Sequence, residues 1–223
     1  YKNWFERINR PFLEFEREIR RKNLLEKSRT VYNSIEEIPK GMERSALQRV
    51  IQILKHHRDV YYCRTKKESL KPTSAIITTI CAEIAQNMNY SLGVFELLQA
   101  IVNDFEIYGE NQVLTEEQFM RQYENKTIIQ KRNGKWYIMN PVNPMDNLAD
   151  SWNSEPQKAE VFFTWVKAIK RDYVESLQYK DNDFVALLEN YFGSDYVKKS
   201  IDLKKYKNVA PQIITSTPKP WRN

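Results

Sequence analysis

The chain has few of the residues on which small, cross-linked folds depend. Cys63 and Cys81 are its only cysteines in 223 residues, too few for a disulfide framework. Together with the adjacent His56 and His57, which we expect at the surface, they do not form the spacing of a zinc site. Only five glycines and nine prolines occur, which argues against a disordered chain. The sequence therefore predicts reduced thiols and a fold that needs neither metal nor disulfides.

Long apolar runs are also missing from the sequence. No run approaches the roughly 20 residues that a membrane-spanning helix requires, and no signal-peptide pattern opens the chain. These absences predict a soluble, cytoplasmic protein without a membrane partner. Because the first residue is Tyr1 rather than methionine, we also expect the chain to be a piece of a longer protein.

Hydrophobic residues make up 41% of the chain and recur mostly at helical spacing. Such stripes are predicted over residues 47–61, 76–88, 94–108 and 162–177, with a shorter one over 184–191. In the first helix the apolar face comprises Leu47, Val50, Ile51, Leu54 and Tyr61. The pattern predicts a mainly α fold, a helical bundle with one small β-hairpin.

Turn and cap residues set the expected boundaries of these elements. Pro11 should kink or restart the N-terminal helix, and Ser91 should cap the helix that Gly109 ends. Thr115 and Gln118 form a capping-box pattern. We expect residues 1–44 to be a leading helical segment with a connector, and residues 45–223 to form a helical domain.

The only β signal lies within residues 127–139. Two β-rich runs flank Asn133-Gly134, a dipeptide typical of a two-residue hairpin turn. The following residues, 140–150, contain two prolines and many turn formers, so no regular element is predicted there.

Positive charge is concentrated in the first of these helices and in the link that joins it to the next. The chain carries a net charge of +6, and the segment Arg44 to Lys71 holds eight lysines and arginines against two acidic residues. Lys55 falls at the edge of the apolar stripe, so its amine is expected to reach a cleft. Lys71-Pro72-Thr73-Ser74 opens the next helix, and free N–H groups and hydroxyls at a helix start suit an anion. Lys55 and Ser74 are therefore candidate ligands of one phosphate chain, with Lys71 and Thr73 beside them.

Arg58 lies on the apolar stripe, seven residues after Ile51, and a cation there needs a partner. Two interpretations remain open from the residues alone. Arg58 holds a carboxylate from another segment, or it faces the same cleft as Lys55.

Three motifs in order, QRVIQILKHHRD, KPTSAIITTI and NPVNPMDNLADSW, together with the opening YKNWF, resemble a known family. They are similar to the C-terminal helical half of the cGAS/oligoadenylate-synthase-like nucleotidyltransferases, and most of all to the bacterial CD-NTases. The resemblance implies that this chain is the C-terminal lobe of a two-lobed enzyme with an α+β whole. It also implies that the whole enzyme makes cyclic di- or oligonucleotide messengers from nucleoside triphosphates in anti-phage, CBASS-like signalling.

The resemblance further implies particular ligands and partners. Lys55 and Ser74 would bind the triphosphate of the donor nucleotide, with Lys71, Thr73 and Arg58 as further nucleotide-binding residues. Mg²⁺ would be bound by carboxylates of a catalytic core that precedes Tyr1, and that core and CBASS accessory proteins would be partners. This chain would therefore hold no catalytic or metal-binding residues and would be inactive alone.

One departure from the family pattern limits the chemistry expected of the chain. The family needs a Gly-Ser turn followed by paired carboxylates that hold two metal ions. Asp181 and Asp183 open a helix and lack that turn, whereas Gly193-Ser194 is followed by Asp202 with a lysine in place of the second carboxylate. Neither segment matches the family's pattern of metal-binding carboxylates.

The alternative function is a non-catalytic helical module that binds RNA or a partner protein through the basic Arg44 to Lys71 surface.

Overall fold

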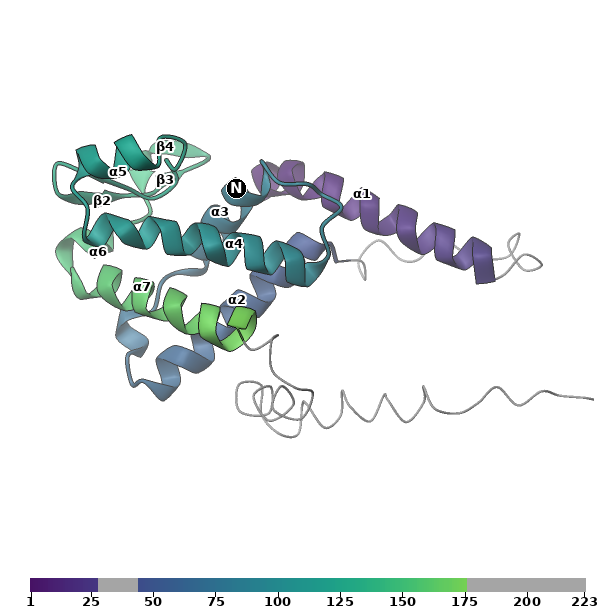
Figure 1. The fold of residues 1–223 in the computed structure, drawn as a ribbon, viewed down its shortest axis with the longest axis horizontal. Helices are drawn as coiled ribbons and strands as arrows, with labels where there is room; N and C mark the ends of the chain where they lie inside the picture. The colour runs from purple at the N-terminus through teal and green to yellow at the C-terminus, as the bar shows by residue number, and fades with distance from the viewer. Residues whose placement is uncertain (28–43, 176–223) are drawn as a thin grey trace, which may run out of the picture. The chain divides into compact units, whose positions relative to one another are not determined.

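The computed structural model describes residues 1–27 and 44–175, which belong to a compact unit that extends from Tyr1 to Glu175. This part of the chain is mainly helical, as the sequence predicts (Figure 1). The connector around Pro39, the helix expected over residues 184–191 and the acidic residues Asp181, Asp183 and Asp202 lie outside the described residues. The α-helices are α1 (Lys2–Lys27), α2 (Ala46–Arg64), α3 (Ser74–Ala85), α4 (Val94–Gly109), α5 (Glu116–Gln122), α6 (Asp150–Ser154) and α7 (Gln157–Ile169).

Helix α1 is continuous through Pro11, so the predicted restart of the helix there is wrong. Proline removes one backbone hydrogen bond and crowds the preceding turn, which disfavours the helix locally. Trp4, Ile8 and Phe12 recur every four residues on one face and are all buried. Their packing against α2 and α3 offsets the local cost of the proline.

Helix α2 begins with a complete capping box. The Ser45 hydroxyl accepts a hydrogen bond from the Gln48 N–H at 3.1 Å, and the Gln48 side chain accepts one from the Ser45 N–H at 3.0 Å. Leu47, Val50 and Leu54 are fully buried, whereas Tyr61 is only half-buried. The buried face contacts α1, α3, α4 and α7, so α2 lies at the centre of the helical packing.

The structure confirms the end of α4 at Gly109 but places its start two residues later than predicted. Gly93, not Ser91, is the N-cap, and its N–H donates to the Glu96 side chain at 2.8 Å. The Ser91 hydroxyl instead donates to Asn89 within the preceding turn, at 2.8 Å. The Thr115–Gln118 capping box at the start of α5 is confirmed.

The predicted hairpin is present as the antiparallel pair β1 (Gln130–Arg132) and β2 (Lys135–Tyr137). Asn133 and Gly134 form its turn with positive φ values of 50° and 77°, a conformation that favours these two residues. The prediction of no regular element after it is wrong, because β3 (Met139–Asn140) and β4 (Asn143–Asn147) form a second antiparallel pair. Pro144 is tolerated there because a strand in a two-stranded pair has an unpaired edge.

A cluster of aromatic rings joins the hairpin to α6 and α7. Trp136 of β2 packs against Trp152 of α6 and Phe163 of α7, with ring centroids 5.9 and 5.4 Å apart. These rings are almost completely buried and form the core at this end of the helical bundle. None of the helices within residues 1–27 and 44–175 is both long and apolar enough to cross a membrane.

Candidate functional site

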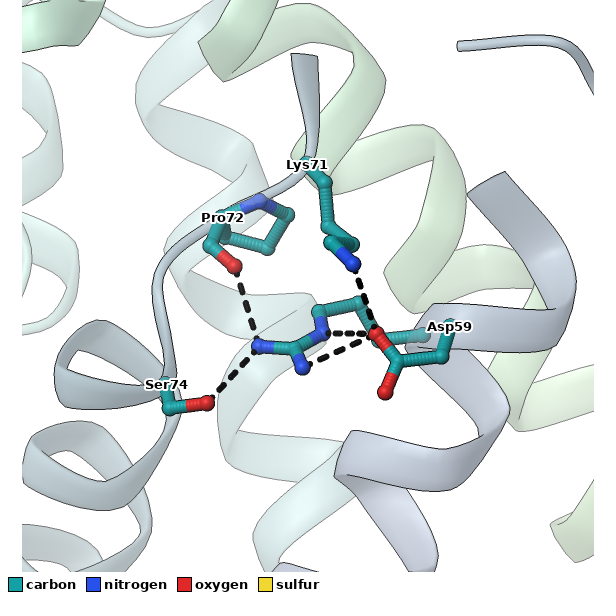
Figure 2. A network of polar contacts seen from close by, with 5 residues as sticks. Asp59, Lys71, Pro72 and Ser74 are labelled. Atoms are coloured by element: carbon teal, nitrogen blue, oxygen red, sulfur yellow. Dashed lines mark hydrogen bonds and ion pairs between the residues drawn. The ribbon is translucent and has the colours of Figure 1, made fainter. Parts of the chain in front are cut away.

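The C-terminal half of α2 is joined to the start of α3 by the guanidinium of Arg58. Its Nη1 donates to the Pro72 carbonyl at 3.1 Å and to the Ser74 hydroxyl at 3.2 Å (Figure 2). Arg58 Nε and Nη2 lie 3.0 and 2.9 Å from Oδ1 of Asp59. Arg58 is 6% exposed, and its buried guanidinium has the hydrogen-bond partners that a buried charge needs.

The sequence left two interpretations of Arg58 open, and the structure corrects the first of them. A carboxylate does hold Arg58, but it comes from the adjacent residue Asp59 rather than from another segment. The same guanidinium reaches Ser74, one of the two predicted phosphate ligands. Arg58 therefore fixes the position of the α3 start relative to α2.

Lys71 completes this network from the segment that leads into α3. Its Nζ lies 3.0 Å from Oδ1 of Asp59, the same oxygen that Arg58 contacts (Figure 2). Partial burial alone would raise the pKa of Asp59, but the hydrogen bond from Lys71 and the charge of Arg58 outweigh burial and lower this pKa. Asp59 is therefore a carboxylate at neutral pH.

Thr73 and Ser74 have different roles at the start of α3. Thr73 is the N-cap, and its hydroxyl accepts a 3.4 Å hydrogen bond from the Ile76 N–H. Ser74 is the first helical residue, and it is exposed. Since Thr73 already caps the helix, the Ser74 hydroxyl is not needed as a cap and is available to a ligand on its exposed side.

Lys55 lies three residues before Arg58, on the same side of α2. It is half-buried, and burial lowers the pKa of its amine below the ordinary value, with the positive charge of Arg58 acting in the same direction. Burial raises the pKa of the Cys81 thiol of α3, and the positive charge of Lys55 acts in the opposite direction. Among the described residues, no carboxylate forms an ion pair with Lys55, so its charge is not neutralised locally.

The structure thus brings Arg58, Lys71 and Ser74 into one hydrogen-bonded network and places Lys55 within electrostatic reach of it. The sequence analysis did not identify Asp59 as part of this site. Arg58 and Asp59 are adjacent in the sequence, so their pairing could have been predicted. The ion pair between Asp59 and Lys71, twelve residues later, depends on the turn between the helices.

The expectation that His57 lies at the surface is wrong, whereas His56 is exposed as predicted. His57 is 2% exposed and lies between α2 and α7. Trp165 Nε1 donates to His57 Nδ1 at 3.0 Å, and His57 Nε2 lies 3.0 Å from Asp172 Oδ2. The buried imidazole therefore links α2 to α7 and to the π-helical turn Lys170–Glu175 that follows it.

The described residues do not provide a metal site. Across residues 1–27 and 44–175, no three His, Cys, Asp or Glu side chains are close enough together to hold an ion. Cys63 is exposed, Cys81 is buried, and both are free thiols. The carboxylate that belongs to the site, Asp59, is occupied by two cations.

Comparison with known proteins gives one informative similarity. No protein-family model matches the chain. A protein named c-di-GMP synthase from Roseivirga ehrenbergii is 26% identical over 164 residues, which cover 73% of this chain. The matched segment covers 38% of the length of that protein, so this chain corresponds to well under half of the relative.

Proposed function

We propose that the chain is the donor-nucleotide-binding lobe of a nucleotidyltransferase that makes a cyclic di- or oligonucleotide from nucleoside triphosphates. In this proposal Lys55 and the exposed side of Ser74 bind the triphosphate, and Lys71 and Thr73 lie at its edge. Arg58 holds the two helices that carry these groups. From the sequence resemblance we also propose that the whole enzyme acts in anti-phage, CBASS-like signalling and that accessory proteins are its partners.

The observation that carries the proposal is the link from Arg58 to Ser74. It brings the start of α3 against α2, on the side of that helix where Lys55 carries a positive charge without a carboxylate partner in the described part of the chain. A partly desolvated ammonium beside exposed hydroxyls at a helix start is suited to phosphate oxygens. The similarity to a protein named c-di-GMP synthase supports the same class of substrate.

The chemistry that joins nucleotides is assigned to the rest of the protein. Two Mg²⁺ ions would align the attacking hydroxyl and neutralise the leaving pyrophosphate, but the described residues do not fit such a pair of ions. We therefore assign no bond-forming step to the residues that the structure describes. In this proposal, those residues bind and orient the donor phosphates.

The proposal predicts that Lys55→Ala weakens the binding of GTP and ATP by about tenfold or more. A charge-assisted hydrogen bond to phosphate is worth roughly 1.5–3 kcal/mol, and every 1.4 kcal/mol corresponds to a factor of ten in Kd. The measurement is equilibrium titration of the chain with each nucleotide.

Lys67→Ala is the matched control, because Lys67 is an exposed lysine of the same basic segment and lies in the turn after α2. A specific nucleotide pocket predicts that Lys67→Ala has little effect on GTP affinity. Equal losses in both variants would instead favour the second candidate function, a basic surface that binds RNA. Unchanged affinity in Lys55→Ala would refute the assignment of Lys55.

A further inference from the structure

One oxygen of the Asp59 carboxylate accepts all the hydrogen bonds that this side chain forms with Arg58 and Lys71. Its Oδ1 lies within 3.0 Å of three donors, namely Arg58 Nε, Arg58 Nη2 and Lys71 Nζ. Every hydrogen bond and ion pair that Asp59 forms through its side chain with the described residues is made by Oδ1, and none by Oδ2. The Asp59 side chain is 50% exposed, so it meets solvent beside the proposed phosphate site.

The two cations that contact Asp59 are held unequally. Arg58 has further contacts with Pro72 and Ser74, and its side chain is 8% exposed. The Lys71 side chain is 38% exposed, and within residues 1–27 and 44–175 its ammonium forms an ion pair with Asp59 alone. Exposed lysine ion pairs are weak, typically below about 1 kcal/mol. Lys71 can therefore leave Asp59 at small cost, whereas Arg58 stays in place.

We propose that Asp59 is an internal competitor of phosphate at this site: its carboxylate holds Lys71, and a bound phosphate chain takes Lys71 over. This inference rests on the proposed function, because it concerns the same phosphate site. Asp59 then limits the affinity for anions, so that the site binds a triphosphate without retaining every phosphate-bearing molecule.

The charges at the site indicate that Asp59 lowers the affinity for phosphate. Lys55, Arg58 and Lys71 contribute three positive charges, and Asp59 cancels one of them. A phosphate that approaches Lys71 is repelled by the adjacent Asp59 carboxylate and must also separate the lysine from it. The repulsion grows with the charge of the ligand, whereas the cost of separating Lys71 from Asp59 is fixed, and an uncharged nucleoside meets neither.

The test is the substitution Asp59→Asn, which keeps the shape of the side chain and an acceptor oxygen for Arg58 but removes the charge. We expect GTP to bind about threefold to tenfold more tightly, GMP to gain less, and guanosine to be unchanged. The measurement is equilibrium titration of the wild-type chain and the variant with all three ligands. An unchanged or weaker affinity for GTP in the variant would overturn the proposal.

A second measurement reports on Asp59 itself in the wild-type protein. The carboxyl carbon of Asp59 is followed by NMR as the pH changes, with and without saturating GTP. Loss of Lys71 and the approach of phosphate should both raise the pKa of Asp59, which lies below its ordinary value without ligand. The same pKa with and without GTP would contradict the release of Lys71.

Glu155→Gln is the matched control for Asp59→Asn. Glu155 contacts Lys158 at 2.6 Å, so the control also removes one acidic charge from a lysine pair, but at the start of α7. We expect its GTP affinity to equal that of the wild type. Failure of the proposed function would appear as absence of GTP binding to the wild-type chain. Failure of this inference alone would appear as GTP binding that depends on Lys55 but does not increase in Asp59→Asn.

Discussion

At the scale of the residue, the charged form of Lys55 is less favourable in the folded protein than in the unfolded chain. Burial and Arg58 both lower its pKa, which means that the folded protein disfavours the charged amine relative to the unfolded chain. Residues retained at such a cost are typical of binding sites, where a ligand supplies the missing partner. This is the same property that makes Lys55 suited to phosphate.

The account therefore predicts that Lys55→Met stabilises the protein while it weakens nucleotide binding. Because Lys55 is only half-buried, solvent screens its charge, and the increase in the free energy of unfolding should not exceed about 1 kcal/mol. For a protein of this size that is an increase in Tm of roughly 2–4 °C. Thermal unfolding at neutral pH is the measurement, and exposed Lys67→Met is the control, with no expected change.

The pH dependence of this gain has a definite sign. The pKa of Lys55 is lower in the folded than in the unfolded protein, so the unfolded chain binds more protons between the two values. The stability of the wild type should therefore rise with pH in that interval, and the advantage of Lys55→Met should shrink. A lower Tm for Lys55→Met than for the wild type at neutral pH would contradict the account.

Single residues of the site were predictable from the sequence to different degrees. The position of Lys55 at the edge of a stripe, and of Ser74 at a helix start, follows from helical periodicity and from the Lys-Pro-Thr-Ser pattern. The pairing of Asp59 with Lys71 does not, because it requires the turn at 65–70 to bring two non-neighbouring residues within 3.0 Å. The buried position of His57 was missed because its partners, Trp165 and Asp172, lie more than 100 residues away.

At the scale of the element, the His57 network fixes α2 against α7 directly beside the site. His57 is the neighbour of Arg58 and two residues from Lys55, so movement of α2 at His57 would shift both cations. A buried hydrogen bond positions an element more precisely than apolar contact alone, since its geometry is directional.

Trp165→Phe tests this link by removing the indole donor to His57. Loss of one hydrogen bond at a buried imidazole should lower the free energy of unfolding by about 1–3 kcal/mol. The measurement is chemical denaturation. Trp152→Phe is the control, because Trp152 is another buried indole and forms no hydrogen bond through its ring nitrogen with the described residues. Equal losses in the two variants would show that ring volume, not the hydrogen bond, stabilises this region.

Helix starts and turns were predicted correctly where interactions between residues close in sequence determine them. The capping box at Thr115 and the Asn133-Gly134 turn are short-range signals, and both are confirmed. The β3–β4 pair was missed because its stability comes from tertiary contacts. Asn147, for example, accepts from Ile138 N–H at 2.9 Å and donates to the Trp136 carbonyl at 3.0 Å. Composition alone, with two prolines, favoured a loop.

At the scale of the whole molecule, the net charge of +6 and the basic segment before α3 attract anions of every kind. Salt dependence separates the two candidate functions. A surface that binds several RNA phosphates should lose about 10³-fold or more in affinity between 50 and 200 mM salt, whereas a pocket for one triphosphate should respond much less. Titration with GTP and with a single-stranded RNA at both salt concentrations measures the difference. A GTP affinity as salt-sensitive as that of RNA would contradict a specific pocket.

The most direct test of the central claim is mass spectrometry of the chain after incubation with all four nucleoside triphosphates and Mg²⁺. Both the species retained by the protein and those released are identified, with Lys55→Ala treated in parallel. The account predicts a retained, intact triphosphate that is lost in Lys55→Ala, and no linked product. Retention that is absent, or equal in both proteins, would contradict the donor-binding site, and release of a linked nucleotide would show that the chain carries its own catalytic carboxylates.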